Sequence, residues 1–202
     1  MASGKPATPG AAAITGLILA GGRGQRMGGV DKGLQPWRGV ALVDHALARL
    51  APQVREVMIS ANRNAALYAS RSARVLADES GDYPGPLAGI LAGMRAAPTP
   101  WLAVVPCDSP QLPLDLVARL AQGVALAQGA VVQRDAGDAG PRLEPVCCLL
   151  STTLVDDLAR YLAAGGRKVE GWVGRHATPV RFDRPEDAMA FANVNTLADL
   201  QA

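Results

Sequence analysis

An apolar run that ends abruptly in a glycine-rich, cationic loop is the feature that most constrains the fold. The run covers residues 14–20, and five glycines follow it within residues 21–29. Arg23, Arg26 and Lys32 add positive charge to the same stretch. A loop of this kind directly after a buried strand is typical of open α/β sheets, which bind nucleotides at the carboxyl ends of their strands. Backbone N–H groups left accessible by glycine, together with nearby cations, suit a polyphosphate above other ligands.

Two common nucleotide-binding motifs do not account for this loop. The chain contains neither Gly-Lys-Ser nor Gly-Lys-Thr, which excludes a Walker P-loop. A dinucleotide fingerprint could begin with Gly22 and Gly24, but Met27 stands where a third small residue is needed. The acid at a suitable distance, Asp44, lies within a predicted helix instead of at a strand end. A nicotinamide site and an ordinary surface connection remain as alternatives, and three cations among five glycines favour a phosphate-binding loop over both.

Length and composition indicate one domain with an aliphatic core. The 202 residues predict a disordered tail over residues 1–13 and a single domain over residues 14–202. Hydrophobic residues make up 49% of the chain but aromatic residues only 4%, so Ala, Val, Leu and Ile must fill the core. A net charge of +2 argues against the strongly basic surface of a nucleic-acid-binding protein.

The chain also lacks the signals of export and of membrane insertion. It has no signal-peptide pattern and no run of about eighteen apolar residues that could span a bilayer. Its three cysteines are odd in number and two are adjacent, so no disulfide framework is indicated. These features predict a cytoplasmic protein with neither a nucleic-acid nor a membrane partner.

Short apolar runs alternate with amphipathic stretches along the chain, which predicts a three-layer α/β/α, Rossmann-like, mostly parallel sheet. The predicted strands are residues 14–20, 54–60, 75–77, 101–105, 130–133, 145–150 and 178–182. The predicted helices are residues 42–51, 87–97, 114–122 and 151–164, followed by a terminal helix capped by Thr196 and Asp199.

Two acids follow predicted strands directly. Asp108 comes after residues 101–105, so it is expected at the ligand-binding edge of the sheet. Two interpretations of Asp108 remain open on the residues alone: a cap for the next segment, or a ligand for Mg²⁺, which prefers hard oxygen donors. Asp78 follows residues 75–77 in the same way, and by itself it fits a solvated turn acid.

Four segments together resemble a known family. Residues 19–32 read Leu-Ala-Gly-Gly-x-x-x-Arg-Met-Gly-Gly-x-Asp-Lys and continue with Gly-Leu. The others are Asp-Tyr-Pro-Gly-Pro-Leu-Ala-Gly at residues 82–89, Pro-Cys-Asp-Ser-Pro at 106–110 and Phe-Ala-Asn-Val-Asn-Thr at 191–196. Over residues 14–202 the chain resembles the molybdenum cofactor guanylyltransferases, also called molybdopterin-guanine dinucleotide synthases. They are a branch of the nucleotidyltransferases with a nucleotide-diphospho-sugar transferase-like fold.

The resemblance implies a GTP and Mg²⁺ site in the N-terminal part of the domain. Arg26 and Lys32 would neutralise triphosphate charge and Asp108 would hold the metal, so these three are the implied catalytic residues. The implied nucleotide-binding residues are Leu19, Ala20, Gly21, Lys32, Asp78, Gly89 and Asp108. Related cytidylyltransferases tend to have an alanine where this chain has Gly21, and the missing Cβ leaves room for a purine. On the residues alone, Gly89 is equally a glycine inside a helix.

The resemblance assigns the C-terminal part of the domain to molybdopterin. The implied pterin-binding residues are Arg167, Lys168, Asn193 and Asn195, although the two asparagines also fit a turn before a helix cap. Two departures from the family pattern are visible. Ser60 replaces an asparagine that is frequent at the end of the second strand, and Glu144 begins a segment that reads His-Pro-Thr in relatives.

The implied reaction is transfer of GMP from GTP to the terminal phosphate of molybdenum-bearing molybdopterin, with release of pyrophosphate. Its partners would be GTP and molybdopterin, with molybdoenzymes, their chaperones and upstream cofactor-synthesis proteins as further candidates. One alternative is another nucleotidyltransferase, which makes a cytidine dinucleotide cofactor or a nucleotide sugar. A second is a non-catalytic nucleotide-binding adaptor, which would not need Asp108 together with Lys32 and Arg26.

The histidines do not suggest catalytic machinery. His45 lies in a predicted helix, and neither His45 nor His176 has a metal-ligand partner at useful spacing. A phosphate monoester that attacks as the nucleophile is already ionised near neutral pH, so nucleotidyl transfer needs no general base. The sequence therefore favours catalysis by positioning and charge neutralisation.

Overall fold

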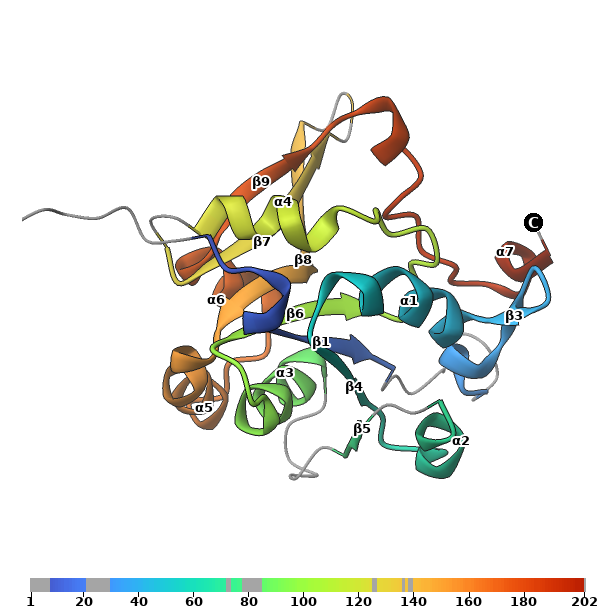
Figure 1. The fold of residues 1–202 in the computed structure, drawn as a ribbon, viewed down its shortest axis with the longest axis horizontal. Helices are drawn as coiled ribbons and strands as arrows, with labels where there is room; N and C mark the ends of the chain where they lie inside the picture. The colour runs from blue at the N-terminus through green and yellow to red at the C-terminus, as the bar shows by residue number, and fades with distance from the viewer. Residues whose placement is uncertain are drawn as a thin grey trace, which may run out of the picture.

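A seven-stranded sheet forms the centre of the part of the chain that the computed structural model describes, which is residues 8–20, 30–71, 74–77, 85–124, 127–135, 137 and 140–201. The strand order is β5-β4-β1-β6-β8-β7-β9 (Figure 1). The strands are β1 Ile14–Leu19, β4 Glu56–Ser60, β5 Arg74–Leu76, β6 Trp101–Pro106, β7 Gly129–Asp135, β8 Pro141–Ser151 and β9 Thr178–Phe182. Strand β8 is antiparallel to both of its neighbours and the other pairings are parallel, which confirms the mostly parallel sheet.

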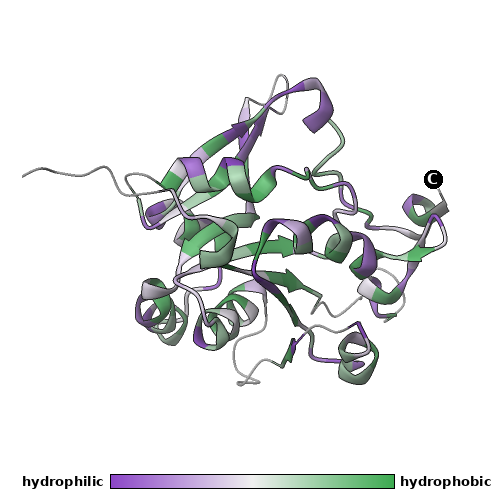
Figure 2. Cartoon of the chain, viewed as in Figure 1, coloured by the Kyte–Doolittle hydropathy of each residue, from purple (hydrophilic) through white to green (hydrophobic). Residues whose placement is uncertain are grey.

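Helices cover both faces of this sheet. The helices are α1 Leu42–Leu50, α2 Ala65–Ala69, α3 Pro86–Ala96, α4 Leu116–Gly123, α5 Val155–Ala163, α6 Val169–His176 and α7 Leu197–Gln201. Alternate residues of β1 point into two separate cores: Ile14 and Ile18 belong to the core that contains residues of α1 and α4, and Leu17 belongs to the core that contains residues of α3, α5 and α6. Figure 2 shows the hydrophobic strands between the helical layers, which confirms the three-layer α/β/α arrangement. None of the described helices is long and apolar enough to cross a membrane.

The structure adds elements that the sequence did not predict. Helix α6 contains Gly171 and Gly174, which weaken a helical pattern, and it buries only Trp172 and Val173. A two-stranded hairpin, β2 Pro36–Trp37 with β3 Val40–Ala41, precedes α1. Strands β7 and β8 are longer than the predicted strands 130–133 and 145–150, because their pairing runs from Gly129 with Leu150 to Asp135 with Pro141.

The chain ends of the predicted fold are partly described. Ala11–Ala13 form a short 3-10 helix directly before β1, and residues 1–7 of the predicted tail lie outside the described residues. At the other end, the Asp199 carboxylate accepts hydrogen bonds from the backbone N–H groups of Asn195 and Thr196 at 2.7 and 2.8 Å. The Asp199 N–H donates to the Thr196 hydroxyl at 3.2 Å, so the predicted cap of the terminal helix is confirmed.

A buried ion pair ties the segment after β9 to α4. Both oxygens of Asp187 accept 2.9 Å hydrogen bonds from the Arg119 guanidinium, which also donates to the Arg181 carbonyl. The guanidinium lies 3.6 Å from the centre of the Phe182 ring, and Phe191 packs edge-on against the same ring. The chain that leads to the Asn-x-Asn segment, residues 193–195, is therefore fixed to the body of the fold.

We expect Asp187→Ala to lower the free energy of unfolding by about 3–5 kcal/mol, because the buried Arg119 charge loses its close partner and keeps a 3.8 Å contact with the 47% exposed Asp115. Arg160→Ala is the control. Arg160 forms an ion pair with Asp157 at the surface, where its side chain is 78% exposed, and such a pair is worth about 1 kcal/mol or less. Urea unfolding followed by circular dichroism measures both. Equal destabilisation by the two variants would contradict this account of the Arg119–Asp187 pair.

Candidate active site

The ends of β1 and β6 form a crevice at the carboxyl edge of the sheet. The chain runs from β1 outward to β4 and β5 and then returns to the other side of β1 as β6. Ligand sites in open α/β sheets lie at such a reversal of strand order. A cavity of about 240 Å³ opens here. It is lined by Leu19, Ala20, Lys32, Ser60, Gly85, Pro86, Gly89, Pro106, Cys107, Asp108, Val146 and Asn193.

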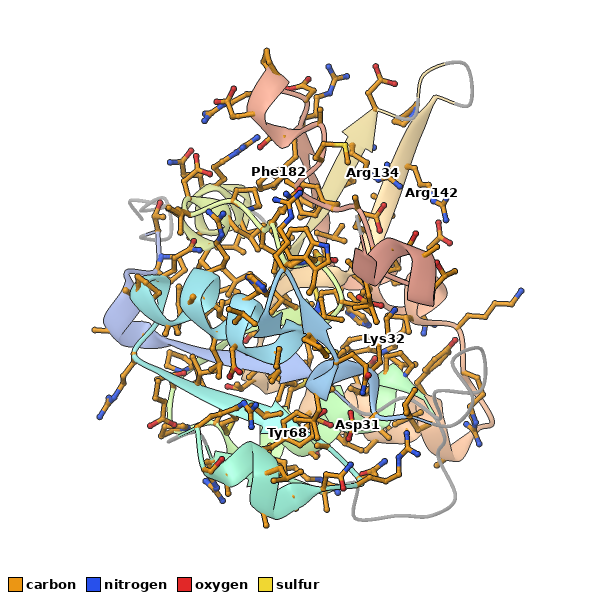
Figure 3. The ribbon with its side chains drawn as sticks, turned by 90° about the vertical axis from the view of Figure 1, so that its right-hand side faces the viewer. Asp31, Lys32, Tyr68, Arg134, Arg142 and Phe182 are labelled. Atoms are coloured by element: carbon orange, nitrogen blue, oxygen red, sulfur yellow. The ribbon has the colours of Figure 1, made fainter. Side chains whose placement is uncertain are left out.

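A lysine and an aspartate pair at the mouth of this crevice. Lys32 Nζ donates to Asp108 Oδ2 at 2.7 Å and to Asn195 Oδ1 at 2.7 Å, and Figure 3 looks toward this edge of the sheet. The Lys32 and Asp108 side chains are 19% and 22% exposed, so the pair is partly screened from water. The other carboxylate oxygen, Asp108 Oδ1, is buried and has no hydrogen-bond partner among the described residues. A buried acceptor without a donor is uncommon and is suited to a cation.

The C-terminal Asn-x-Asn segment lies against the same aspartate. Asn193 accepts a 2.8 Å hydrogen bond from the Ser109 hydroxyl, and the Val194 N–H donates to the Asp108 carbonyl at 2.9 Å. The Val194 side chain is buried in a small cluster with Trp37 and Leu42, which belong to the hairpin and to α1. The fold therefore brings residues 193–195 next to Asp108 and Lys32.

Helix α3 reaches the cavity through two glycines. Gly85 precedes the helix with φ 131°, a conformation that residues with a Cβ rarely adopt. One turn later, a Cβ on Gly89 would lie 2.5 Å from the Ser60 hydroxyl and 3.0 Å from a Leu19 methyl group. Gly89 thus permits a close contact between α3 and the strands that form the cavity, so it is more than a tolerated helix-interior residue.

The cysteines are buried and the histidines have partners elsewhere. Cys107, Cys147 and Cys148 are all free thiols, as expected from their number and spacing. Burial and the neighbouring Asp108 raise the pKa of the Cys107 thiol to about 12, so it remains protonated and is a poor nucleophile at neutral pH. His45 contacts the Trp37 carbonyl and His176 contacts Asp157, and neither histidine lines the cavity.

Several predicted site residues do not line this cavity or lie outside the described residues. Arg26, Gly21 and Asp78 fall outside the described residues. Arg167 donates to the carbonyls of Leu162 and Gly166 at 2.9 and 2.7 Å, at the end of α5, and Lys168 is exposed at the start of α6. The structure does bring together Leu19, Ala20, Lys32, Gly89, Asp108, Asn193 and Asn195.

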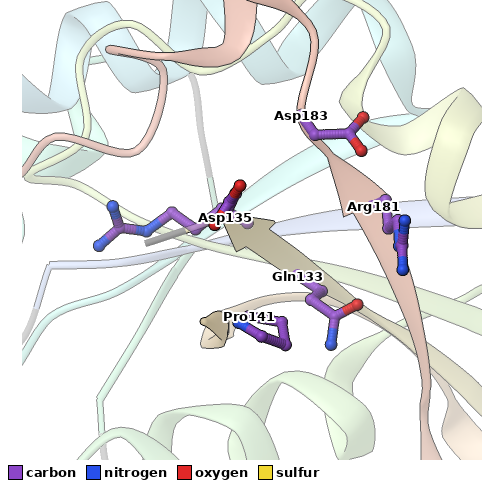
Figure 4. Close-up of a pocket in the computed structure, with 6 residues that line it drawn as sticks. Gln133, Asp135, Pro141, Arg181 and Asp183 are labelled. Atoms are coloured by element: carbon purple, nitrogen blue, oxygen red, sulfur yellow. The ribbon is translucent and has the colours of Figure 1, made fainter. Parts of the chain in front are cut away.

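A second hollow of about 180 Å³ lies along β7, β8 and β9 (Figure 4). It is lined by Gln133, Arg134, Asp135, Pro141, Arg181 and Asp183. It shares no lining residue with the cavity at the β1–β6 crevice. Arg134, which contributes to it, forms an ion pair with Glu144 across the two strands. Glu144, the departure from the family pattern, therefore has a partner in the sheet.

Comparison with known proteins identifies the family of this chain. Residues 16–179 match the family model described as the MobA-like NTP transferase domain. The chain belongs to this family. It is therefore a nucleotidyltransferase, and the expected nucleotide-diphospho-sugar transferase-like fold is confirmed.

Several known proteins align with this chain over nearly its whole length. The molybdenum cofactor guanylyltransferase of Acidovorax ebreus (strain TPSY) is 53% identical, with 94% of each chain covered. The protein of the same name from Ralstonia nicotianae is 51% identical over 93% of this chain and 94% of its own. Among solved structures, molybdopterin-guanine dinucleotide biosynthesis protein A from Archaeoglobus fulgidus superposes with a TM-score of 0.73 at 23% identity, covering 93% of this chain and 95% of that protein.

We expect Gly89→Ala to lower the free energy of unfolding by about 1–3 kcal/mol and to weaken nucleotide binding, because the new methyl group meets the Ser60 hydroxyl. The double variant Gly89→Ala/Ser60→Ala removes that oxygen and should recover part of the stability. Gly174→Ala is the control, because a Cβ there meets no atom within 4 Å. It should stabilise α6 by up to about 1 kcal/mol. No loss of stability in Gly89→Ala would contradict the close contact.

Proposed function

We propose that this MobA-like nucleotidyltransferase transfers GMP from GTP to the terminal phosphate of molybdenum-bearing molybdopterin and releases pyrophosphate. The observation that carries the proposal is identity of 51–53% over almost the full length to proteins named molybdenum cofactor guanylyltransferase. A cytidylyltransferase or a nucleotide-sugar enzyme is less favoured, because the full-length relatives carry the guanylyltransferase name. A non-catalytic adaptor is not favoured either, since the family is one of transferases.

Lys32 is the cation that we assign to the triphosphate. An ammonium group has three N–H donors, and two of them bind Asp108 and Asn195. The third N–H can donate to a phosphate oxygen while the hydrogen bonds to Asp108 and Asn195 stay in place. Its positive charge would offset the charge that builds on the pyrophosphate as it leaves. We assign Arg26 the same task from its place in the family motif.

Asp108 is the residue that we assign to a divalent metal, which we propose to be Mg²⁺. The buried Oδ1 atom without a partner, on a hard carboxylate, fits such an ion. One solved relative, Rv0371C of Mycobacterium tuberculosis, has a manganese complex, with a TM-score of 0.64 at 20% identity. The described residues contain no group of three or more acids, histidines or cysteines around one point. Mg²⁺ is usually held by one or two carboxylates together with substrate phosphates, so phosphate oxygens would complete the shell. The bound ion would supply positive charge to the triphosphate.

The acceptor needs positioning and no general base. The terminal phosphate of the pterin has its second pKa near 6, so it is a nucleophile already at neutral pH. We assign Asn193 and Asn195 to its binding, and we add Arg167 and Lys168 from their place in the family pattern, since neither lines the cavity. The two asparagines lie beside Lys32 and Asp108, where the two substrates have to meet.

The cytoplasmic location of the protein remains a prediction from the sequence.

With Mg²⁺ and molybdopterin present, GTP should support pyrophosphate release at least about tenfold faster than CTP, a discrimination of about 1.4 kcal/mol. The expectation comes from the sequence, because Gly21 lacks the Cβ that related cytidylyltransferases tend to have at this position. A coupled pyrophosphate assay with each of the four nucleoside triphosphates gives the comparison. Equal or faster turnover with CTP would reject the guanylyl assignment and leave the nucleotidyltransferase assignment in place.

Asp108→Asn should lower turnover about a hundredfold or more, because it keeps the shape of the side chain and removes the charge that is proposed to hold the metal. Asp135→Asn is the control, since it makes the same chemical change at the end of β7, outside the cavity lining. Titration with Mn²⁺ followed by electron paramagnetic resonance should show weaker metal binding only in Asp108→Asn. Unchanged metal affinity in that variant would refute the assignment.

A further inference from the structure

Asp31, the residue before Lys32, accepts hydrogen bonds from two side chains that lie far from it in the sequence. Tyr68 Oη donates to Asp31 Oδ1 at 2.5 Å, and Asn64 Nδ2 donates to Asp31 Oδ2 at 2.9 Å (Figure 3). Both donors belong to the segment that links β4 to β5, where Tyr68 is part of α2 and Asn64 precedes it. Each oxygen of the Asp31 carboxylate therefore has a donor, which fixes the orientation of the group.

Tyr68 is a rigid donor. Its side chain is fully buried and packs in the same core as Ala61 and Cys107. Burial, followed by the hydrogen bond to Asp31 and the negative charge of that carboxylate, raises the pKa of the Tyr68 hydroxyl well above its ordinary value. The hydroxyl is therefore protonated throughout the neutral range. A hydroxyl that donates to a carboxylate at this distance makes one of the stronger hydrogen bonds found in proteins.

Asn64 contributes through an unusual backbone conformation. Its φ of 53° places it in the left-handed region, which asparagine tolerates better than most residues. In this conformation Asn64 begins α2, and its carbonyl accepts hydrogen bonds from Leu67 and Tyr68. The side-chain amide is then free to reach Asp31. The two donors are thus coupled, because the turn that orients Asn64 also starts the helix that carries Tyr68.

The turn that carries Lys32 rests directly on this support. The Asp31 carbonyl accepts hydrogen bonds from the Leu34 N–H at 3.2 Å and from the Gln35 side chain at 3.1 Å. A Cβ on Gly33 would lie 2.5 Å from the Tyr68 phenol oxygen, so the backbone of the turn packs against that oxygen. Asp31 and Gly33 hold the backbone on both sides of Lys32, and the Lys32 side chain extends from this turn to Asp108.

We propose that Tyr68 and Asn64 are positioning residues that hold Lys32, through Asp31, where the triphosphate binds. They touch neither Asp108 nor any residue from Asn193 to Asn195 through a hydrogen bond of the described structure, so their action on the site runs through the turn. A lysine side chain is flexible, and fixing its base reduces the freedom that is lost when it binds a phosphate. The proposal rests on the proposed function only in that the triphosphate belongs to a nucleotide.

A double-mutant cycle between Tyr68→Phe and Lys32→Ala tests the coupling. Equilibrium binding of Mg²⁺–GTP, measured by calorimetry, gives the affinity of each variant. With Lys32 present, Tyr68→Phe should weaken binding about tenfold, the scale of one hydrogen bond to a charged group. In the Lys32→Ala background the same change should alter affinity less than about twofold, since its effect runs through the lysine. Similar losses in both backgrounds would overturn the proposal.

Two further variants separate positioning from packing. Asn64→Gly removes the side-chain amide and can keep the left-handed conformation. Because Asn64 is exposed, this variant can replace Tyr68→Phe in the cycle if Tyr68→Phe does not fold. Tyr161→Phe removes a hydroxyl that donates to the Lys168 carbonyl and should leave nucleotide affinity unchanged. A lower melting temperature in Tyr68→Phe with nucleotide affinity unchanged would assign Tyr68 to the core alone and overturn the proposal.

A base-free ligand keeps this test independent of the guanylyl assignment. Inorganic tripolyphosphate with Mg²⁺ replaces GTP in the same cycle, because it presents the phosphates without a base. A wild-type protein that prefers CTP to GTP would reject the proposed function alone. Loss of tripolyphosphate affinity in Tyr68→Phe that disappears in the Lys32→Ala background supports the positioning role in either case. An additive result with tripolyphosphate overturns it.

Discussion

The contact between Lys32 and Asp108 is the interaction around which the rest of the site is arranged. These residues are 76 positions apart in the chain, and Asn195, which completes the contact, lies 163 positions from Lys32. Three different parts of the fold must therefore be fixed before one ammonium group has its partners. The β1–β6 pairing places Asp108, the turn after residue 30 places Lys32, and the buried Val194 places Asn195.

Each of these three parts has its own anchor in the body of the protein. Asp108 follows a strand that is buried on both faces, so its backbone has little freedom. The turn at Lys32 packs against the Tyr68 hydroxyl, and the C-terminal segment is tied to α4 by the Arg119–Asp187 pair. The charges of the site are only partly exposed, and a charge in such surroundings is useful only when its position is fixed.

Much of the fold could be predicted from the sequence, because its strands are continuous apolar runs. The runs at Ile14–Leu19 and Trp101–Pro106 and the amphipathic pattern at Leu42–Leu50 each specify one element without help from the rest of the chain. Helix α6 was missed because its glycines and short apolar stripe give a weak period. The β2–β3 hairpin was missed because its turn uses Arg38 and Gly39, and arginine at positive φ is not a turn signal.

The site was predictable only where it lies within sequence motifs. Lys32, Asp108 and the two asparagines stand in short strings of recognisable type, so their proximity could be expected from the order of the strands. Tyr68 stands in no such string, and its hydrogen bond to Asp31 spans 37 positions, which no local period reveals. Its one signal was the presence of an aromatic residue in a chain with only 4% of them.

The distance in sequence between Lys32 and Asn195 has a consequence for how the protein is made. Synthesis proceeds from the N-terminus, so the turn that carries Lys32 exists long before residues 193–195 leave the ribosome. During that interval β1, β4 and β6 can pair, but the lysine has no amide partner and the crevice lacks one of its walls. A nascent chain thus presents an incomplete crevice, and the assembled site belongs to the finished polypeptide.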